Sequence, residues 1–308
     1  MTGSLSREAR RFLASLPPMA ERPLPPQPED LDGWAAFRER VEQRVSERDR
    51  EWLAQAQVEY GVTIDAPFDN RCTLRLRTGN SKDRPAIIYL HGGGYTCFSP
   101  RSSLRATLPL AAALDTTVIS VDYLKAPHHR FRQVVERCSQ EVSRYLGPGT
   151  ALVGDSAGGG LALAVTLRLA ALGQPLPQAL ALWSPWVDLD DWDDSVDDPI
   201  VRYQGDLAHA ASCYAPGADA EHPLASPVRA NWPASFPPVL LQSGAREGLR
   251  RSIRRLARRL QEAGITCQHA EVPGLFHSFP SLAPLLPESV NAMSQVRTFL
   301  AKHSPVPP

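Results

Sequence analysis

The sequence lacks a net charge and long apolar runs, and each absence argues against a class of protein. Its 33 Lys and Arg residues equal its 33 Asp and Glu residues, so no overall field attracts nucleic acid or an anionic membrane. No run of 18 apolar residues occurs, which argues against a membrane-spanning helix. We therefore expect no nucleic-acid partner and no membrane partner, and a neutral organic molecule fits better as the substrate.

Paired cysteines are also absent. The five cysteines form neither a C-x-x-C pair nor a zinc-like spacing; they are Cys72, Cys97, Cys138, Cys213 and Cys267. The N-terminal stretch 1–18 has only a short apolar patch interrupted by arginines, which fails as a secretory signal. We expect free thiols in a reducing cytosol, hence a cytoplasmic protein, and no metal site.

We interpret two charged segments as solvated surface and not as binding sites. Seven aspartates between residues 188 and 198 lack the spacing and the glycine of a calcium-binding loop, and we interpret them as a solvent-facing loop. Six arginines between residues 250 and 259 recur at helical spacing beside leucines. They predict an amphipathic helix with a solvated basic face.

Short β-rich runs alternate with longer helical patterns after residue 60 of this 308-residue chain of 33.7 kDa. We expect strands at residues 72–78, 86–91, 117–122, 151–155, 179–184, 239–244 and 267–272. We expect helices between them at residues 103–114, 131–146, 157–172 and 249–263, with Gly264 as the cap of the last one. Such alternation predicts an α/β fold with a mostly parallel sheet flanked by helices.

Two further segments stand outside this rhythm. Residues 31–60 show the spacing of a helix but carry no visible chemistry. Residues 188–238 are crowded with Asp, Pro and Trp and interrupt the alternation of strands and helices. We interpret residues 1–60 and the insertion 188–238 as a cap over a domain that spans residues 61–308, and we interpret the stretch around His303 as a polar tail.

A Gly-x-Ser-x-Gly motif, Gly154-Asp155-Ser156-Ala157-Gly158, follows an apolar run and precedes a helical pattern. A tight turn from strand to helix exposes the serine hydroxyl, and only glycines at the flanking positions let the backbone turn so sharply. We therefore expect Ser156 to be a nucleophile, with Asp155 as a supporting residue of the motif.

A His-Gly-Gly-Gly motif at residues 91–94 follows directly on another apolar run. Successive glycines let backbone N–H groups point into a cleft, where they stabilise the oxygen that becomes negative when a carbonyl carbon turns tetrahedral. Ala157 adds an N–H group at the positive end of the helix after the serine. The expected oxyanion donors are Gly93, Gly94 and Ala157, with His91 and Gly92 as supporting residues.

A serine hydroxyl is a weak nucleophile at neutral pH and needs a base, which in turn needs an acid to hold its tautomer. His277 follows a strand in a loop-forming stretch, whereas His269 lies inside the strand pattern itself. The loop after residues 239–244 offers one carboxylate, Glu247. We expect a triad of Ser156, His277 and Glu247. Glu247 keeps a second interpretation, an acid that only complements a helix dipole.

The motifs at residues 91–94, 155–159 and 273–277 together resemble those of the hormone-sensitive-lipase-like esterases (bacterial family IV) of the α/β-hydrolase superfamily, over residues 70–300. Residues 184–189 and 223–227 also resemble stretches of that family. The resemblance implies an α/β-hydrolase fold with a helical cap built from the N-terminus and an insertion. It further implies a carboxylesterase that acts without a cofactor, and a homodimer is an additional expectation because members of the family often pair.

Two stretches depart from the family pattern. Residues 123–128 read Tyr-Leu-Lys-Ala-Pro-His, where members of the family usually carry Tyr-Arg-Leu-Ala-Pro-Glu, so the bracing of the nearby loops must differ. The usual acidic loop Asp-Pro-Leu-x-Asp reads Glu-Gly-Leu-Arg-Arg at residues 247–251. The second acid is therefore missing, and the first is a glutamate.

These features predict a serine hydrolase that cleaves small-molecule carboxylic esters, and the resemblance implies short acyl chains. Two alternatives stay open: transfer of the acyl group to an alcohol or amine, or closure of a lactone, and a small-molecule-binding protein without turnover. The presence of both Ser156 and His277 argues against the second alternative. Candidate substrate-binding residues are the aromatic residues Trp34, Tyr95, Phe98, Trp186, Tyr203 and Phe279.

Overall fold

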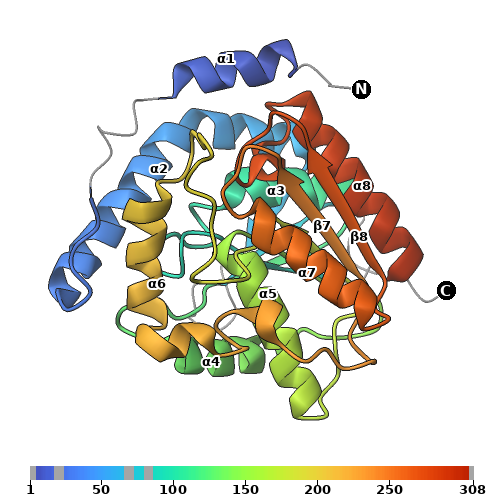
Figure 1. The fold of residues 1–308 in the computed structure, drawn as a ribbon. Helices are drawn as coiled ribbons and strands as arrows, with labels where there is room; N and C mark the ends of the chain where they lie inside the picture. The colour runs from blue at the N-terminus through green and yellow to red at the C-terminus, as the bar shows by residue number, and fades with distance from the viewer. Residues whose placement is uncertain (1–4, 17–23, 66–72, 80–85, 305–308) are drawn as a thin grey trace.

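One eight-stranded sheet runs through the molecule (Figure 1), of which the computed structural model describes residues 5–16, 24–65, 73–79 and 86–304. The strands are β1 (Thr63–Asp65), β2 (Leu74–Arg77), β3 (Ile87–Leu90), β4 (Val118–Val121), β5 (Ala151–Asp155), β6 (Leu180–Trp183), β7 (Val239–Gly244) and β8 (Cys267–Val272). Their order across the sheet is β1-β2-β4-β3-β5-β6-β7-β8. β1 and β2 pair antiparallel to their neighbours, and all other pairs are parallel. The predicted α/β fold with a mostly parallel sheet is confirmed.

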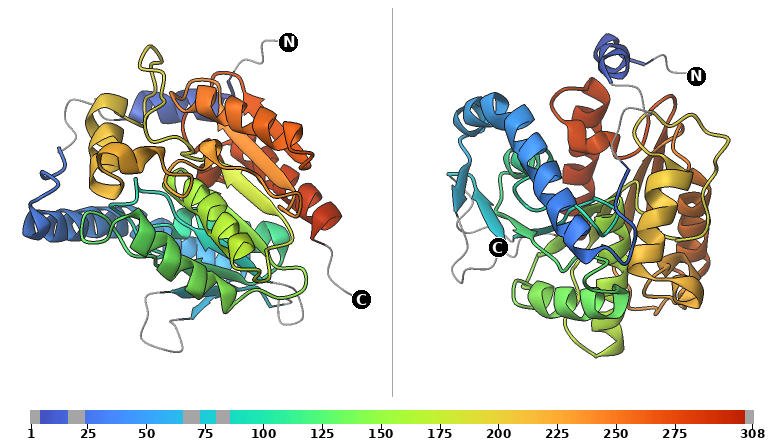
Figure 2. Two further views of the ribbon diagram at one scale, coloured as in Figure 1. Left: turned by 60° about the horizontal axis from the view of Figure 1, so that its bottom comes forward. Right: turned by 90° about the vertical axis from the view of Figure 1, so that its left-hand side faces the viewer.

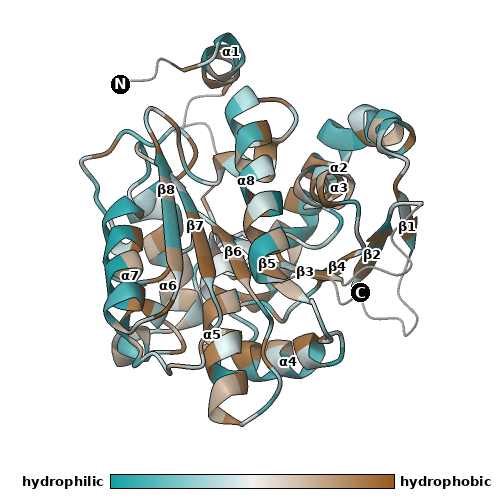
Figure 3. Ribbon diagram, turned by 90° about the vertical axis from the view of Figure 1, so that its right-hand side faces the viewer, coloured by the Kyte–Doolittle hydropathy of each residue, from teal (hydrophilic) through white to brown (hydrophobic). Residues whose placement is uncertain are grey.

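Helices cover both faces of this sheet. The α-helices are α1 (Arg7–Ser15), α2 (Leu31–Tyr60), α3 (Leu104–Leu114), α4 (Phe131–Ser143), α5 (Ala157–Ala171), α6 (Ala208–Tyr214), α7 (Arg250–Glu262) and α8 (Pro287–His303). The sheet separates α4, α5 and α7 from α3 and α8 (Figure 3). The expected cap of α7 is confirmed, since Gly264 has φ +75° and follows the last turn.

The two faces of the sheet carry two separate cores. Ile88 and Leu90 of β3 pack with residues of α4, α5 and α7, whereas Ile87 and Tyr89 pack with residues of α3 and α8. Successive side chains of a strand point to opposite faces. A strand that is covered on both faces must therefore be apolar along its whole length, and all four residues of β3 are buried.

The parallel strands bring the carboxyl ends of β3, β5, β6, β7 and β8 to one edge of the sheet. In open α/β sheets, sites form in the crevice outside these carboxyl ends. The loops that follow the five strands contain residues 91–98, 156, 184–187, 245–248 and 273–278. All the expected catalytic residues therefore belong to loops at this edge.

Several elements were not predicted from the sequence. The prediction of a polar tail around His303 was wrong, because this residue is the last one of the helix α8. Met293, Val296 and Phe299 of α8 are buried in the core on the face of the sheet that α3 and α8 cover. These apolar residues form a narrow stripe in an otherwise polar stretch, which a helical pattern search recognises poorly. β1 spans three residues and is too short for a periodic signal.

The insertion between β6 and β7 contains a π-helical turn (Tyr203–Leu207), α6 and two short 3-10 turns (Gly217–Glu221 and Pro227–Arg229). α6 lies beside α2 (Figures 1 and 2), where the rings of Trp34 and His209 stack with centroids 5.9 Å apart. The interpretation of residues 1–60 and 188–238 as a cap on a domain of residues 61–308 stays a prediction.

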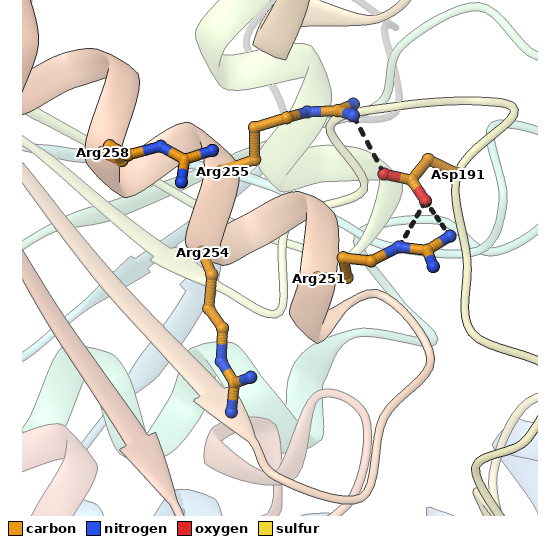
Figure 4. A pocket seen from close by; sticks show the side chains of 5 residues that line it. All are labelled: Asp191, Arg251, Arg254, Arg255 and Arg258. Carbon is orange, nitrogen blue, oxygen red and sulfur yellow. Dashed lines mark hydrogen bonds and ion pairs between the residues drawn. The ribbon is translucent and has the colours of Figure 1, made fainter.

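The expectation that the aspartates of residues 188–198 form a solvent-facing loop holds only in part: Asp190, Asp194 and Asp197 are exposed, whereas Asp188 and Asp198 are buried. Asp188 is fully buried and pairs with Arg229 at 3.2 Å and with Arg255. Asp191 lies between Arg251 and Arg255 in a surface hollow that Arg254 and Arg258 also line (Figure 4). The acidic segment therefore covers part of the basic face of α7. A one-dimensional charge pattern does not show that two such surfaces face each other.

The remaining expectations on cysteines and membranes are tested in part. Cys97, Cys138, Cys213 and Cys267 are free thiols, and Cys72 lies outside the described residues. Within the described ranges, no helix combines the length and the apolar character that crossing a membrane requires. Within the same ranges, no cluster of His, Cys, Asp and Glu side chains is arranged to hold a metal ion.

Candidate active site

Ser156 occupies the turn between β5 and α5, with φ +52° and ψ −121°. This backbone conformation is strained for a residue with a side chain and persists only where the surroundings enforce it. A Cβ atom on Gly154 would lie 2.6 Å from the carbonyl oxygen of Gly158, and one on Gly158 would lie 2.0 Å from that of Leu90. Both glycines are therefore required for the turn that presents Ser156 at the edge of the sheet.

His277 lies in the loop after β8, and its Nε2 atom is 2.8 Å from Oγ of Ser156. The imidazole is buried, and burial lowers the pKa of His277 to about 4 because it disfavours the charged form. At neutral pH the ring is therefore uncharged. A neutral ring that accepts the serine O–H bond at Nε2 carries its own proton on Nδ1.

Glu247 completes the group from the loop after β7, and its side chain is fully buried. Its Oε2 atom is 3.8 Å from Nδ1 of His277 and accepts hydrogen bonds from the hydroxyl of Ser184 and from the N–H of Gly244, at 3.3 Å in the latter case. Burial raises the pKa of Glu247 well above its ordinary value, while the bond from Ser184 opposes that effect. Among the described residues, Nδ1 of His277 and Oε1 of Glu247 have no hydrogen-bond partner.

The loop after β3 carries the two glycines that we expect to be oxyanion donors. Gly93 has φ +105° and Gly94 has φ +61°, conformations that favour glycine. A Cβ atom on Gly93 would lie 2.4 Å from the carbonyl oxygen of Cys97. Ala157 is the first residue of α5, so its N–H group has no partner within the helix and lies at the positive end of the helix dipole.

Comparisons with known proteins agree with this geometry. A family model described as the α/β-hydrolase fold matches residues 87–281. An acetyl-hydrolase of Streptomyces hygroscopicus is 32% identical over 238 residues, which cover 74% of this chain and 79% of the relative. The chain belongs to the α/β-hydrolase fold family.

Two further comparisons narrow the position of this α/β-hydrolase within the family. An ethyl acetate hydrolase of Pseudomonas putida is 30% identical over 237 residues, which cover 71% of this chain and 73% of the relative. The crystal structure of an esterase from the bacterial hormone-sensitive lipase family is 27% identical, with a TM-score of 0.80 and coverage of 98% of this chain and 99% of that chain. The resemblance to the hormone-sensitive-lipase-like esterases is confirmed, and the chain is a carboxylesterase-type serine hydrolase.

Side chains that the sequence analysis only partly foresaw hold the glycine loop of the α/β-hydrolase in place. Asp155 accepts hydrogen bonds from the N–H of Gly92 at 2.8 Å and from the hydroxyl of Tyr89. His91 is fully buried, and its Nδ1 atom lies 2.7 Å from the carbonyl oxygen of Gly92. The hydroxyl of Tyr123 donates to the carbonyl oxygen of His91 at 2.7 Å. Tyr89 lies inside an apolar run, where no sequence signal separates it from ordinary core residues, and the only signal for Tyr123 was its place in the stretch 123–128 that was compared with the family pattern.

Two cations contact residues 123–128, the first of the two stretches that depart from the family pattern. Lys125 pairs with Asp122 and donates to the carbonyl oxygen of Tyr123 at 3.0 Å. Arg38 of α2 donates to the carbonyl oxygen of Ala126 at 3.3 Å. Residues 123–128 are therefore contacted by one cation within the stretch and by one from α2.

The candidate substrate-binding aromatics are mostly packed in the interior. Trp34, Tyr95, Trp186 and Phe279 are buried, and the Tyr95 ring stacks on Tyr214 with centroids 3.7 Å apart. Phe98 is 38% exposed and lies beside Gly93 in the loop after β3. Tyr203 is buried, and its hydroxyl is engaged by two protein groups. A substrate contact for any of these residues stays a prediction.

Ser184 is the functional candidate that the sequence analysis did not name individually. Its hydroxyl donates to Glu247 and accepts the N–H of Ser278, at 2.9 Å in the latter case. The only signal for it was its place in the Ser184-Pro185-Trp186 stretch that resembles the family. Its function depends on two loops that are distant in the sequence.

Proposed function

We propose that Ser156, His277 and Glu247 form the catalytic triad with which this chain cleaves carboxylic esters of short acyl chains. The observation that carries the proposal is the distance of 2.8 Å between Oγ of Ser156 and Nε2 of His277. These two residues are 121 positions apart in the chain, and both lie in loops that follow parallel strands. A buried serine and a buried neutral histidine at this distance form a nucleophile with its general base.

In the first step, Oγ of Ser156 attacks the ester carbonyl carbon while its proton passes to Nε2 of His277. The carbonyl oxygen becomes negative, and the N–H groups of Gly93, Gly94 and Ala157 stabilise it. The tetrahedral intermediate then collapses, and the C–O bond to the alcohol breaks. His277 returns the proton to the departing alcohol, which leaves an acyl group on Ser156.

In the second step, water replaces the alcohol. His277 removes a proton from the water molecule as it attacks the acyl carbon, and the same proton is returned to Oγ of Ser156 when the carboxylic acid leaves. The enzyme regains its initial state without any external reductant, oxidant or metal ion in this scheme. Each proton that moves is held by His277 between transfers.

Glu247 stabilises the positive charge that His277 acquires in both steps. In the resting structure Nδ1 of His277 and Oε2 of Glu247 are 3.8 Å apart, which is longer than a hydrogen bond. Catalytic hydrogen bonds often tighten only when substrate is bound. Within the described residues, Nδ1 of His277 and Oε1 of Glu247 are both buried without a partner, which is costly. We therefore expect Nδ1 to approach the carboxyl of Glu247 as the imidazolium forms.

The assignment to short acyl chains is supported by two relatives whose names specify acetyl groups, the acetyl-hydrolase of Streptomyces hygroscopicus and the ethyl acetate hydrolase of Pseudomonas putida. It is also supported by the packing above the oxyanion loop. A Cβ atom built on Gly94 would lie 3.2 Å from the Cβ of Ala210 in α6. We propose that α6 and α2 belong to a cap that limits the space for the acyl group. A homodimer and a cytoplasmic location stay predictions.

Four measurements test this function: kcat of a serine variant, its labelling, the dependence on acyl length and the products formed with added alcohol. We expect Ser156→Ala to lower kcat for p-nitrophenyl acetate by at least about 10⁴-fold and to abolish labelling by a fluorophosphonate. Labelling that survives this substitution would assign the nucleophile elsewhere. With esters of two to sixteen acyl carbons, we expect kcat/KM to fall as the acyl chain lengthens. A product ratio that shifts strongly to a new ester when an alcohol is added would favour acyl transfer instead.

A further inference from the structure

The hydroxyl of Tyr203 lies between a buried carboxylate and the loop that carries Glu247. It donates to Oδ2 of Asp198 at 2.6 Å and accepts the N–H of Gly248 at 2.7 Å. Asp198 and Tyr203 are 6% and 5% exposed, so these bonds are shielded from water. Neither residue belongs to the triad, and both come from the insertion between β6 and β7.

The Tyr203 ring also fits closely against the backbone of the acid loop. A Cβ atom on Gly248 would lie 2.8 Å from two ring atoms of Tyr203 and 3.0 Å from the carbonyl oxygen of Asp193. The carbonyl oxygen of Gly248 accepts the N–H of Asp193 at 2.9 Å. Both polar groups of Gly248, the residue after Glu247, are therefore bonded to the insertion.

The other side of the acid loop is bonded to the loop of the catalytic base. The N–H of Arg246 donates to the carbonyl oxygen of Leu275 at 2.8 Å, two residues before His277. Glu247 thus lies between a residue held by the histidine loop and a residue held by Tyr203. The relative positions of these two attachments determine where the Glu247 carboxyl lies with respect to His277.

Ion pairs at the surface of the same loop are weaker restraints. Arg246 pairs with Asp197 at 3.0 Å, and Arg250 pairs with Asp193 at 3.1 Å. Asp197 is 95% exposed on its side chain, and an exposed pair such as Arg246–Asp197 contributes little to stability. A buried hydrogen bond is stronger in its low-dielectric surroundings and holds a defined direction. The Tyr203 hydroxyl is therefore the better candidate for orienting the loop.

We propose that Tyr203, held by Asp198, is a positioning residue that orients the Glu247 carboxyl toward His277 through the backbone of Gly248. The inference rests on the proposed function, since it concerns the acid of that triad. It gives the insertion a part in catalysis that is separate from covering the site.

The test is a double-mutant cycle between Tyr203 and Glu247. Tyr203→Phe removes only the hydroxyl, and misplacement of a catalytic group by a fraction of an ångström to one ångström lowers the rate by about tenfold or more. We expect Tyr203→Phe to lower kcat for p-nitrophenyl acetate by about tenfold, with KM changed less than about twofold. In a Glu247→Gln background, the same substitution should lower kcat by less than about twofold, because the carboxylate it positions is gone.

Tyr214→Phe is the matched control. Tyr214 is also buried in the insertion, and within the described residues its hydroxyl has no hydrogen-bond partner. We expect this control to leave kcat unchanged in both backgrounds. Thermal unfolding followed by circular dichroism verifies that each variant is folded. Asp198→Asn provides a second variant, which keeps the shape of the side chain but removes the charge that Tyr203 faces, and its effect on kcat should depend on Glu247 in the same way.

The outcomes separate the inference from the proposed function. If the unmodified chain hydrolyses the ester but Tyr203→Phe behaves like Tyr214→Phe, the positioning role is overturned and the triad stands. If Tyr203→Phe lowers kcat by the same factor in the unmodified chain and in the Glu247→Gln background, its effect is a general structural one and the inference is also overturned. If the unmodified chain is no more active than Ser156→Ala, the proposed function fails, and the inference fails with it.

Discussion

The hydroxyl of Ser184 donates a hydrogen bond to Oε2 of Glu247, a residue 63 positions further along the chain. The same hydroxyl accepts the N–H of Ser278, next to His277, at 2.9 Å. Ser184 therefore connects the loop of the acid with the loop of the base. It is buried completely, and so is Glu247, which means that these contacts are shielded from bulk water.

Removal of this hydroxyl is expected to affect both stability and rate. In Ser184→Ala the buried carboxyl of Glu247 loses its strongest donor, and a buried unsatisfied polar group costs about 1–3 kcal/mol. We expect the free energy of unfolding in urea to fall by this amount and kcat to fall by about tenfold. The matched control is Ser139→Ala in α4, a buried serine whose hydroxyl has no partner among the described residues. A Ser184→Ala variant as active and stable as this control would contradict the connection.

The oxyanion donors are tested by a pair of glycines with nearly the same positive φ. Gly94 has φ +61° and Gly173 has φ +62°, so alanine at either position carries a similar conformational cost of about 1 kcal/mol. A Cβ atom at Gly173 meets nothing within 4 Å, whereas at Gly94 it meets Ala210 at 3.2 Å.

Gly94→Ala should therefore shift the loop that carries the donor, and loss of one oxyanion donor lowers kcat by about 10²- to 10³-fold. Gly173→Ala should leave kcat unchanged while it lowers the melting temperature to a similar extent. The measurements are steady-state kinetics with p-nitrophenyl acetate and thermal unfolding. Equal kinetic effects of the two substitutions would argue that Gly94 takes no part in stabilising the oxyanion.

The pH dependence of kcat/KM should report the buried histidine. Burial lowers the pKa of His277 from 6.5 to about 4, so the free enzyme keeps its base neutral well below the usual titration range of histidine. Burial also raises the pKa of Glu247, so protonation of its carboxylate lowers kcat/KM of the unmodified chain as well. The Glu247→Gln variant removes this second titration, and in it we expect the residual kcat/KM to fall only as the pH decreases toward about 4. An acid limb centred at pH 6.5 or above in Glu247→Gln would contradict the burial of the imidazole in the active enzyme.

The lowered pKa of His277 also makes the free energy of unfolding depend on pH. Between pH 6.5 and about 4, the unfolded chain binds a proton at residue 277 that the folded chain does not bind. The free energy of unfolding therefore decreases as the pH falls through this window. We expect His277→Gln to show a weaker decrease over the same window, measured by urea unfolding at a series of pH values, and an identical decrease would contradict the shifted pKa.

The buried aspartate of the insertion should matter more for folding than its exposed neighbours. Asp188 is fully buried and paired with Arg229 and Arg255, and removal of one partner of a buried pair costs about 3–5 kcal/mol. We expect Asp188→Ala to lower the free energy of unfolding at the lower end of this range, since both arginines are partly exposed. The control Asp197→Ala removes a carboxylate that is 95% exposed and should not change the melting temperature. Equal effects of the two substitutions would contradict a structural role of Asp188.

Sequence patterns predicted the structure correctly where the conformation depends on residues that are close together in the chain. β7 and β8 have the predicted bounds, because short apolar runs between turn-forming residues describe buried strands well. The turn at Ser156 was also predictable, since its two glycines act on the same few residues of backbone. For α8 the prediction was wrong, and for the aspartates of residues 188–198 it held only in part. A narrow apolar stripe and a run of charges are ambiguous until their partners are known.

The sequence by itself therefore determined the α/β architecture and named the serine, the histidine and the glutamate that lie in neighbouring loops. Only the tertiary structure decided that Ser184 and Tyr203 contact the acid loop and that Asp188 is buried against two arginines. The physical reason is that turns and strands depend on the torsion angles and polarity of adjacent residues. A hydrogen bond between two buried side chains depends on how loops from distant parts of the chain pack at the edge of the sheet.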